Sequence, residues 1–123
     1  MTFLVGVETA PLAMVDATEL PAVSEALLDA LAESGWAQDP VTTFRDMDSV
    51  LGARFFIEAS SLSEVNWSSL VFNFLRCVVH AVTDVVPVER LPAGTVFKSG
   101  AGQIEIEPDA MLARVQVEQA PAA

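Results

Sequence analysis

The sequence has few of the residue types on which enzymes and metal sites usually depend. Its 123 residues include one Cys, one His and no Tyr. A single cysteine excludes a disulfide within the chain. One histidine without a second histidine or a cysteine pair cannot complete the usual zinc ligand sets. No candidate nucleophile or base has an evident activating partner. We therefore expect a non-enzymatic protein with no catalytic residues, no cofactor and no metal.

Positive charge is also scarce. Six Lys and Arg stand against seventeen Asp and Glu, which gives a formal net charge of −11 at pH 7. Nucleic-acid binding depends on basic residues that neutralise phosphates. Anionic membrane surfaces attract basic segments in the same way. We therefore expect neither nucleic acid nor membrane among the partners.

A long uninterrupted hydrophobic run is missing as well. The most apolar stretch, residues 65–86, is interrupted by Asn73, Arg76, His80 and Asp84, so we do not expect it to span a membrane. The first residues lack the basic region and the cleavage site of a secretory signal. We expect a cytoplasmic protein, or one assembled into a particle made in the cytoplasm.

The chain does have many hydrophobic residues, at 52%. Disordered chains combine charge with low hydrophobicity, so this composition predicts a folded protein. The length suits one domain with one core. We expect a single domain over residues 1–123, with a frayed tail at 118–123.

Hydrophobic periodicity predicts the elements. Phe3, Val5 and Val7 alternate with other residues, as in a strand with one buried face. A helix is expected after Thr18 as its N-cap, with Gly35 ending it and Trp36 packing back on the core. A second helix, capped by Ser61 or Ser63, covers residues 65–86. The remaining strands are expected at 41–46, 53–60, 95–99, 103–107 and 113–118.

This order of elements predicts an α+β fold. It is typical of a two-layer sandwich, in which a mainly antiparallel sheet has two helices on one face. The first six elements would form a ferredoxin-like core. A C-terminal hairpin would extend or cross the sheet, and Gly100, Ala101 and Gly102 suit the turn between strands 95–99 and 103–107.

The second helix has apolar residues on almost every side. Its polar residues recur at spacings of three and four and therefore form one narrow stripe. A step of about 100° per residue leaves an apolar arc of about 260°, whereas a helix on one small core needs an arc of about 100°. The part of the apolar arc beyond what one core can cover predicts that this helix is also buried against other protein chains. The stripe consists of Asn66, Ser69, Asn73, Arg76, His80 and Thr83.

The leading hypothesis is therefore a protein-association domain that binds other chains, including copies of itself as a homo-oligomer. Burying one more Phe or Leu against a partner contributes about 1.5–3 kcal/mol, so four or five such residues would suffice for a stable interface. The candidates for this interface are Trp67, Val71, Phe74, Val78 and Phe56.

A second hypothesis follows from the acidity. Glu25, Asp29 and Glu33 follow one another at a spacing of four on the polar side of the first helix. They form either a solvated face or a docking ridge for a basic partner, as in an acidic inhibitor or immunity-type protein.

His80 and Asp84 are also one turn apart, either as a surface pair or as a proton switch.

Two resemblances extend these hypotheses. The succession LLDALAESGW, VTTFRD, GARFFIEAS and the following helix resembles the regulatory ACT domains. That resemblance implies small-molecule sensing, but the connection TAPLAMVDATEL lacks the glycine expected for ligand contact, so no binding residue is carried over. The element order is also similar to that of ring-forming components of phage tails, which implies a structural subunit.

Overall fold

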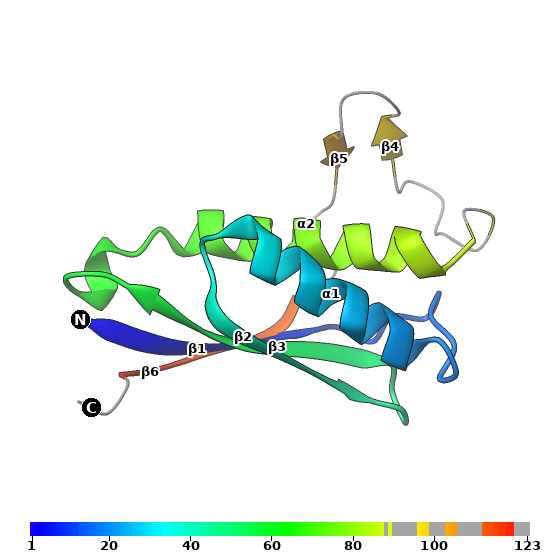
Figure 1. Cartoon of the computed structure of the whole chain (residues 1–123), viewed down its shortest axis with the longest axis horizontal. Coiled ribbons are helices and arrows are strands. Elements are labelled where there is room, and N and C mark those ends of the chain that lie inside the picture. The colour runs from blue at the N-terminus through cyan, green and yellow to red at the C-terminus, as the bar shows by residue number, and fades with distance from the viewer. Residues whose placement is uncertain (88, 90–95, 99–102, 106–111, 120–123) are drawn as a thin grey trace.

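The computed structural model of this chain describes residues 1–87, 89, 96–98, 103–105 and 112–119. The fold is α+β, as the sequence predicts. Helices α1 (Leu20–Ser34) and α2 (Trp67–Val85) lie on one face of an antiparallel sheet (Figure 1). The strands of this sheet are β1 (Thr2–Thr9), β2 (Gln38–Arg45), β3 (Val50–Glu58) and β6 (Leu112–Gln119), and a short 3-10 helix, η1 (Leu62–Glu64), precedes α2.

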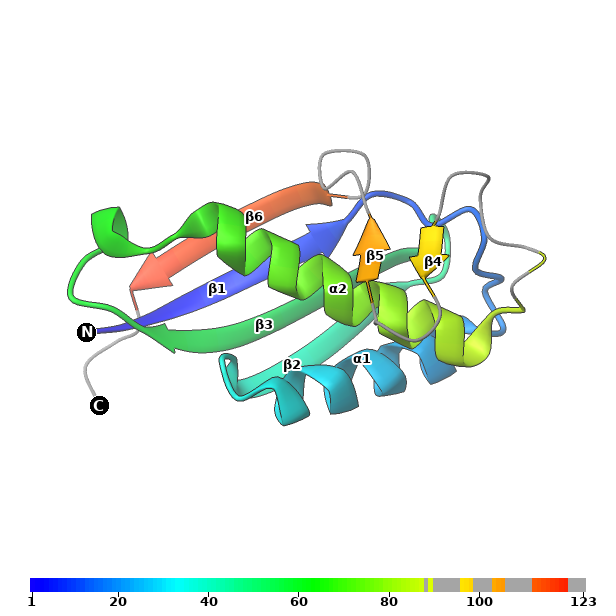
Figure 2. The ribbon, with the colours of Figure 1, turned by 90° about the horizontal axis from the view of Figure 1, so that it is seen from above.

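The strands of the sheet lie in the order β2-β3-β1-β6, and each neighbouring pair is antiparallel (Figure 2). Val5 in β1 pairs with Phe55 in β3 on one side and with Val117 in β6 on the other. The sheet therefore joins the N-terminal strand to the last strand of the chain. Glu118 and Gln119, expected in a frayed tail, are the last residues of β6.

The predicted C-terminal strands are arranged differently from the expectation. β4 (Val96–Lys98) and β5 (Gln103–Glu105) pair only with each other in a separate two-stranded sheet. β6 lies beside β1, with Val5 paired to Val117, in the place where the 95–99 strand was expected. The predicted turn at residues 100–102 lies outside the described residues.

Local chemistry explains where the helices begin and end. Gly35 ends α1 in the left-handed conformation, with φ 79°, as predicted. The N-cap of α1 is Glu19, not Thr18, and no side chain caps it. The N-cap of α2 is Asn66, whose Oδ1 accepts a hydrogen bond of 3.1 Å from the Ser69 amide. Ser61 and Ser63 do not cap α2, because Ser61 is the N-cap of η1 and Ser63 lies within η1.

The core fills the space between the sheet and the two helices. Alternate residues of β1 point into it, as the sequence predicts. Trp36 packs back on Phe55, with their ring centroids 5.0 Å apart in an edge-to-face arrangement. The largest fully buried residues are Phe55, Phe74, Leu12, Leu20, Leu27, Leu31, Leu51 and Leu75.

Candidate functional site

Helix α2 is buried by the chain itself over most of its circumference. Phe74 and Val78 expose 0% of their surface. Their assignment to an interface with another chain is therefore wrong, because they have no surface to offer. The expected arc of about 100° holds for a helix that rests on one surface, but α2 lies against α1 and over the sheet at once (Figure 2). The other buried residues of α2 are Leu70, Leu75, Cys77, Val79, Ala81 and Val82.

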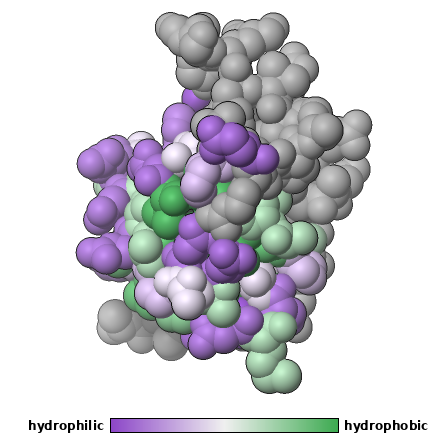
Figure 3. Space-filling view, turned by 90° about the vertical axis from the view of Figure 1, so that its right-hand side faces the viewer, coloured by the Kyte–Doolittle hydropathy of each residue, from purple (hydrophilic) through white to green (hydrophobic). Residues whose placement is uncertain are grey.

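The surface that α2 leaves open is small. Trp67 and Val71 are half-buried against the core. Phe72 is 41% exposed, and the guanidinium carbon of Arg76 lies 5.9 Å from the centroid of its ring. At the end of the molecule that Figure 3 shows, hydrophobic residues are interspersed with hydrophilic ones among the coloured residues. Among the described residues of α2, Phe72 is thus the one large hydrophobic side chain that is exposed.

The acidic ridge lies where the sequence predicts it. Glu25, Asp29 and Glu33 are all exposed on α1, and that helix carries no basic residue. Each carboxylate has another one turn away. The charged residues of α1 are therefore all acidic and all accessible to a basic partner.

The two residues considered for proton transfer are also on the surface. His80 and Asp84 are both exposed, and no ion pair or hydrogen bond joins their side chains in the described part of the chain. Cys77 is buried. Across the described residues, no three His, Cys, Asp or Glu side chains are grouped so that they could hold a metal ion. None of the described helices is long and apolar enough to cross a membrane.

The most distinctive surface is the sheet face turned away from the helices, called the open face below. Phe3, Val5 and Val7 point into the core, so the alternate residues of β1 point outwards. Backbone pairing places outward residues of β2 and β3 beside them. The part of the open face formed by β1, β2 and β3 carries Thr2, Leu4, Gly6 and Glu8 of β1, Gln38, Val41, Thr43 and Arg45 of β2, and Val50, Gly52, Arg54, Phe56 and Glu58 of β3.

Apolar side chains interrupt the polar surface of the open face. Leu4 and Phe56 pair across β1 and β3 and are half-buried. Val41, paired with Arg54, is 57% exposed. Phe56 is thus the sequence-predicted interface residue that lies apart from α2, on the opposite side of the sheet. The candidates do not form one surface.

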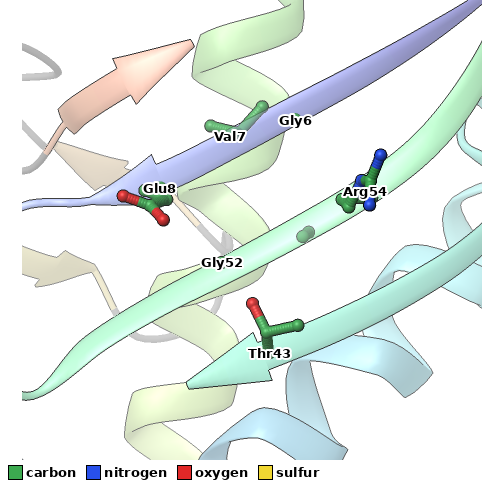
Figure 4. A pocket seen from close by; sticks show the side chains of 7 residues that line it. Gly6, Val7, Glu8, Thr43, Gly52 and Arg54 are labelled. Atoms are coloured by element: carbon green, nitrogen blue, oxygen red, sulfur yellow. The ribbon is translucent and has the colours of Figure 1, made fainter. Parts of the chain in front are cut away.

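A hollow of about 110 Å³ lies in the open face where two strands have glycines (Figure 4). Gly6 and Gly52 form its floor, and Glu8, Thr43 and Arg54 surround it. A Cβ at Gly52 would lie 2.8 Å from Thr43 Oγ1 and 3.5 Å from the Val7 carbonyl oxygen. Gly52 is therefore needed for the close approach of β2 and β3.

The charges around the hollow are balanced. Arg45 contacts Glu8, with Nη1 to Oε1 at 3.8 Å, and Asp48, with Nη2 to Oδ2 at 3.2 Å. These exposed pairs add little stability. Arg54 is exposed at the other end of the hollow from Glu8 (Figure 4). Sequence reasoning missed this site, although a lone glycine within each of two strands is a signal of close backbone approach.

Comparison with known proteins identifies no relative: no family model, no curated protein and no solved structure matches this chain. The candidate site therefore stands on the geometry and chemistry of this chain.

Proposed function

We propose that this chain is a non-enzymatic protein-association domain, with a ferredoxin-like core, that serves as a self-assembling subunit of a larger complex. The strand order β2-β3-β1-β6, with both helices on one face, supports the ferredoxin-like core. The observation that carries the association is the open face, where Leu4, Phe56 and Val41 lie among balanced charges. An antiparallel sheet can leave one face to solvent, but that face is then mainly polar.

Sedimentation velocity over a series of micromolar concentrations tests this function. We expect the mean sedimentation coefficient to rise with concentration, because weak association follows mass action. Native mass spectrometry of the same samples gives the subunit count and separates a dimer from a ring of the phage-tail type. A single monomeric species at every concentration would contradict self-association.

A second candidate function is that of an acidic inhibitor, and the exposed ridge on α1 favours it. A helix with Glu25, Asp29 and Glu33 and no basic residue attracts a basic protein surface at long range. Such binding weakens sharply as salt is added, because mobile ions screen the charges.

Charge reversal tests the inhibitor function with polylysine as the probe. The variant E25K/D29K/E33K should bind polylysine more weakly than the control D46K/E64K/D84K, which makes the same change in net charge at other exposed positions. Equal binding by the two variants would show that net charge, and not the ridge, causes the attraction.

Small-molecule sensing of the ACT type stays a prediction from resemblance, without a residue assigned to it. Calorimetric titration with the common amino acids tests it directly. Heat that saturates at one equivalent would support it, and no heat from any of them would exclude it.

A further inference from the structure

We propose that a second copy of this chain packs on the open face, sheet against sheet, so that Arg54 of each copy lies over the hollow at Gly6 of the other. The inference rests on the proposed self-association and names the surface that performs it. Three observations lead to it: the distribution of charge, the register of β1 and β3, and the chemistry of the sheet edge at β2.

The charge distribution selects the face on which two copies can meet. With a net charge of −11, two identical chains repel each other wherever acidic surfaces come together. On α1 the charged residues are all acidic. On the open face of β1, β2 and β3, two arginines, Arg45 and Arg54, balance two glutamates, Glu8 and Glu58. Two copies therefore meet with less repulsion through the open face than through α1.

The register of the sheet makes the open face complementary to itself. Arg54 pairs with Gly6, and Phe56 pairs with Leu4, across β1 and β3. Consider a two-fold axis that runs above the open face, parallel to β1 and β3 and midway between them. This axis lays β3 of one copy over β1 of the other. Each Phe56 then covers Leu4 of the partner subunit. Each Arg54 then lies over Gly6 of the partner subunit, between the partner subunit's Arg54, which pairs with that Gly6, and the partner subunit's Glu8, two residues further along β1.

This arrangement matches a long side chain to a hollow and brings two arginines and two glutamates together beside the axis. The hollow exists because Gly6 and Gly52 have no side chains. Glu8 lies at its edge with 33% of its side chain exposed, and its carboxylate makes one long contact of 3.8 Å with Arg45. The guanidinium of Arg54 from the other copy would therefore meet a carboxylate that Arg45 already orients. Contacts between opposite charges of this kind fix the register of two surfaces.

The free edge of β2 is a poor alternative route to self-association. Pro40 lies within this strand and has no N–H group to donate to another strand. Asp39 has a positive φ of 48°, and the pairing with β3 shifts register between Gln38 and Val41. Prolines and bulges of this kind protect an edge from pairing with a further strand. Continuation of the sheet through β2 is thus disfavoured.

The size of the face indicates a reversible dimer. Four strands of about eight residues cover roughly 26 by 19 Å, about 500 Å² in projection. This is smaller than the roughly 800 Å² per partner of a standard stable interface. The dimer should therefore dissociate on dilution, and a concentration series is the right measurement.

Sedimentation velocity of two single-arginine variants tests the inference. R54E should weaken dimerisation by at least about tenfold, because the introduced carboxylate would face Glu8 of the partner subunit. R76E makes the same change in net charge at an exposed position on α2 and should leave the dimer intact. Circular dichroism confirms that both variants are folded.

A mixture of two variants with complementary charges provides the decisive experiment. E8R and R54E should each be monomeric alone at concentrations where the wild-type chain is dimeric. When they are mixed, both contacts again join an arginine to a glutamate, so a heterodimer should form. The inference is overturned if R54E dimerises like the wild type, or if the mixture stays monomeric. In those cases the proposed self-association still stands, whereas a wild-type chain that is monomeric at every concentration removes the self-association itself.

Discussion

Ser24 in α1 and Thr42 in β2 hold the helix to the sheet by a reciprocal pair of hydrogen bonds. Ser24 Oγ donates to Thr42 Oγ1 at 3.0 Å, and Thr42 Oγ1 donates to the Ser24 carbonyl oxygen at 3.1 Å. Ser24 is buried, with 5% of its surface exposed. The buried hydroxyl of Ser24 and the half-buried hydroxyl of Thr42 thus both have hydrogen-bond partners, which keeps the cost of their burial small.

Thr42→Val should destabilise the fold by about 1–3 kcal/mol, because it removes both hydrogen bonds and leaves the buried Ser24 hydroxyl without its partner. Ser24→Ala should cost less, since Thr42 can still donate to the carbonyl oxygen at position 24. Urea denaturation followed by circular dichroism gives both values. A smaller loss for Thr42→Val than for Ser24→Ala would contradict the reciprocal arrangement.

Gly52→Ala should destabilise the fold by about 1–3 kcal/mol, as overpacking does. The new Cβ would approach Thr43 Oγ1 to 2.8 Å and force that side chain to move. Gly52→Ala with Thr43→Ala should recover most of the loss, because the remaining neighbours are at 3.5 Å or more. Thermal unfolding of the wild type, the two single variants and the double variant measures this coupling. Additive losses would show that Thr43 is not the obstacle.

Two phenylalanines of α2 form a matched pair for testing the placement of that helix. Phe74→Ala should cost about 3–5 kcal/mol, as for a large side chain in a core, since Phe74 is 0% exposed. Phe72→Ala should cost far less, because Phe72 is 41% exposed. The free energies of unfolding in urea compare them. Equal losses would mean that α2 is rotated about its axis relative to the described orientation.

Cys77 provides a test that depends on pH. Burial raises the pKa of its thiol above the ordinary 9.0, and the charge of Arg76 opposes this shift in part. The unfolded chain therefore releases the thiol proton at a lower pH than the folded chain, so stability should fall as pH rises through 9.0.

The contribution of this one thiol is isolated by Cys77→Ala. The difference in urea midpoint between wild type and variant should be constant below pH 9.0 and should shift against the wild type above it. Iodoacetamide should also react more slowly with the native chain than with the unfolded chain. A pH-independent difference together with rapid native alkylation would show that the thiol is accessible.

The local sequence determined most of the elements of this fold. Alternation placed Phe3, Val5 and Val7 in a buried face, and glycine conformation placed the end of α1 at Gly35. These features depend on a few neighbouring residues, so a short window contains the needed information. Helix capping was harder to predict, because several polar residues compete near each end: Asn66, and not Ser61 or Ser63, caps α2.

The tertiary structure decided which apolar residues are left for a partner. The all-round apolar character of α2 was evident from its sequence, but the sequence could not show that α1 and the sheet both cover it, and so bury Phe74 and Val78. It could not show that β6 would lie beside β1, or that Gly6 and Gly52, far apart in the chain, would meet in one hollow. Burial and adjacency depend on contacts between distant segments, whereas periodicity is a property of each segment alone.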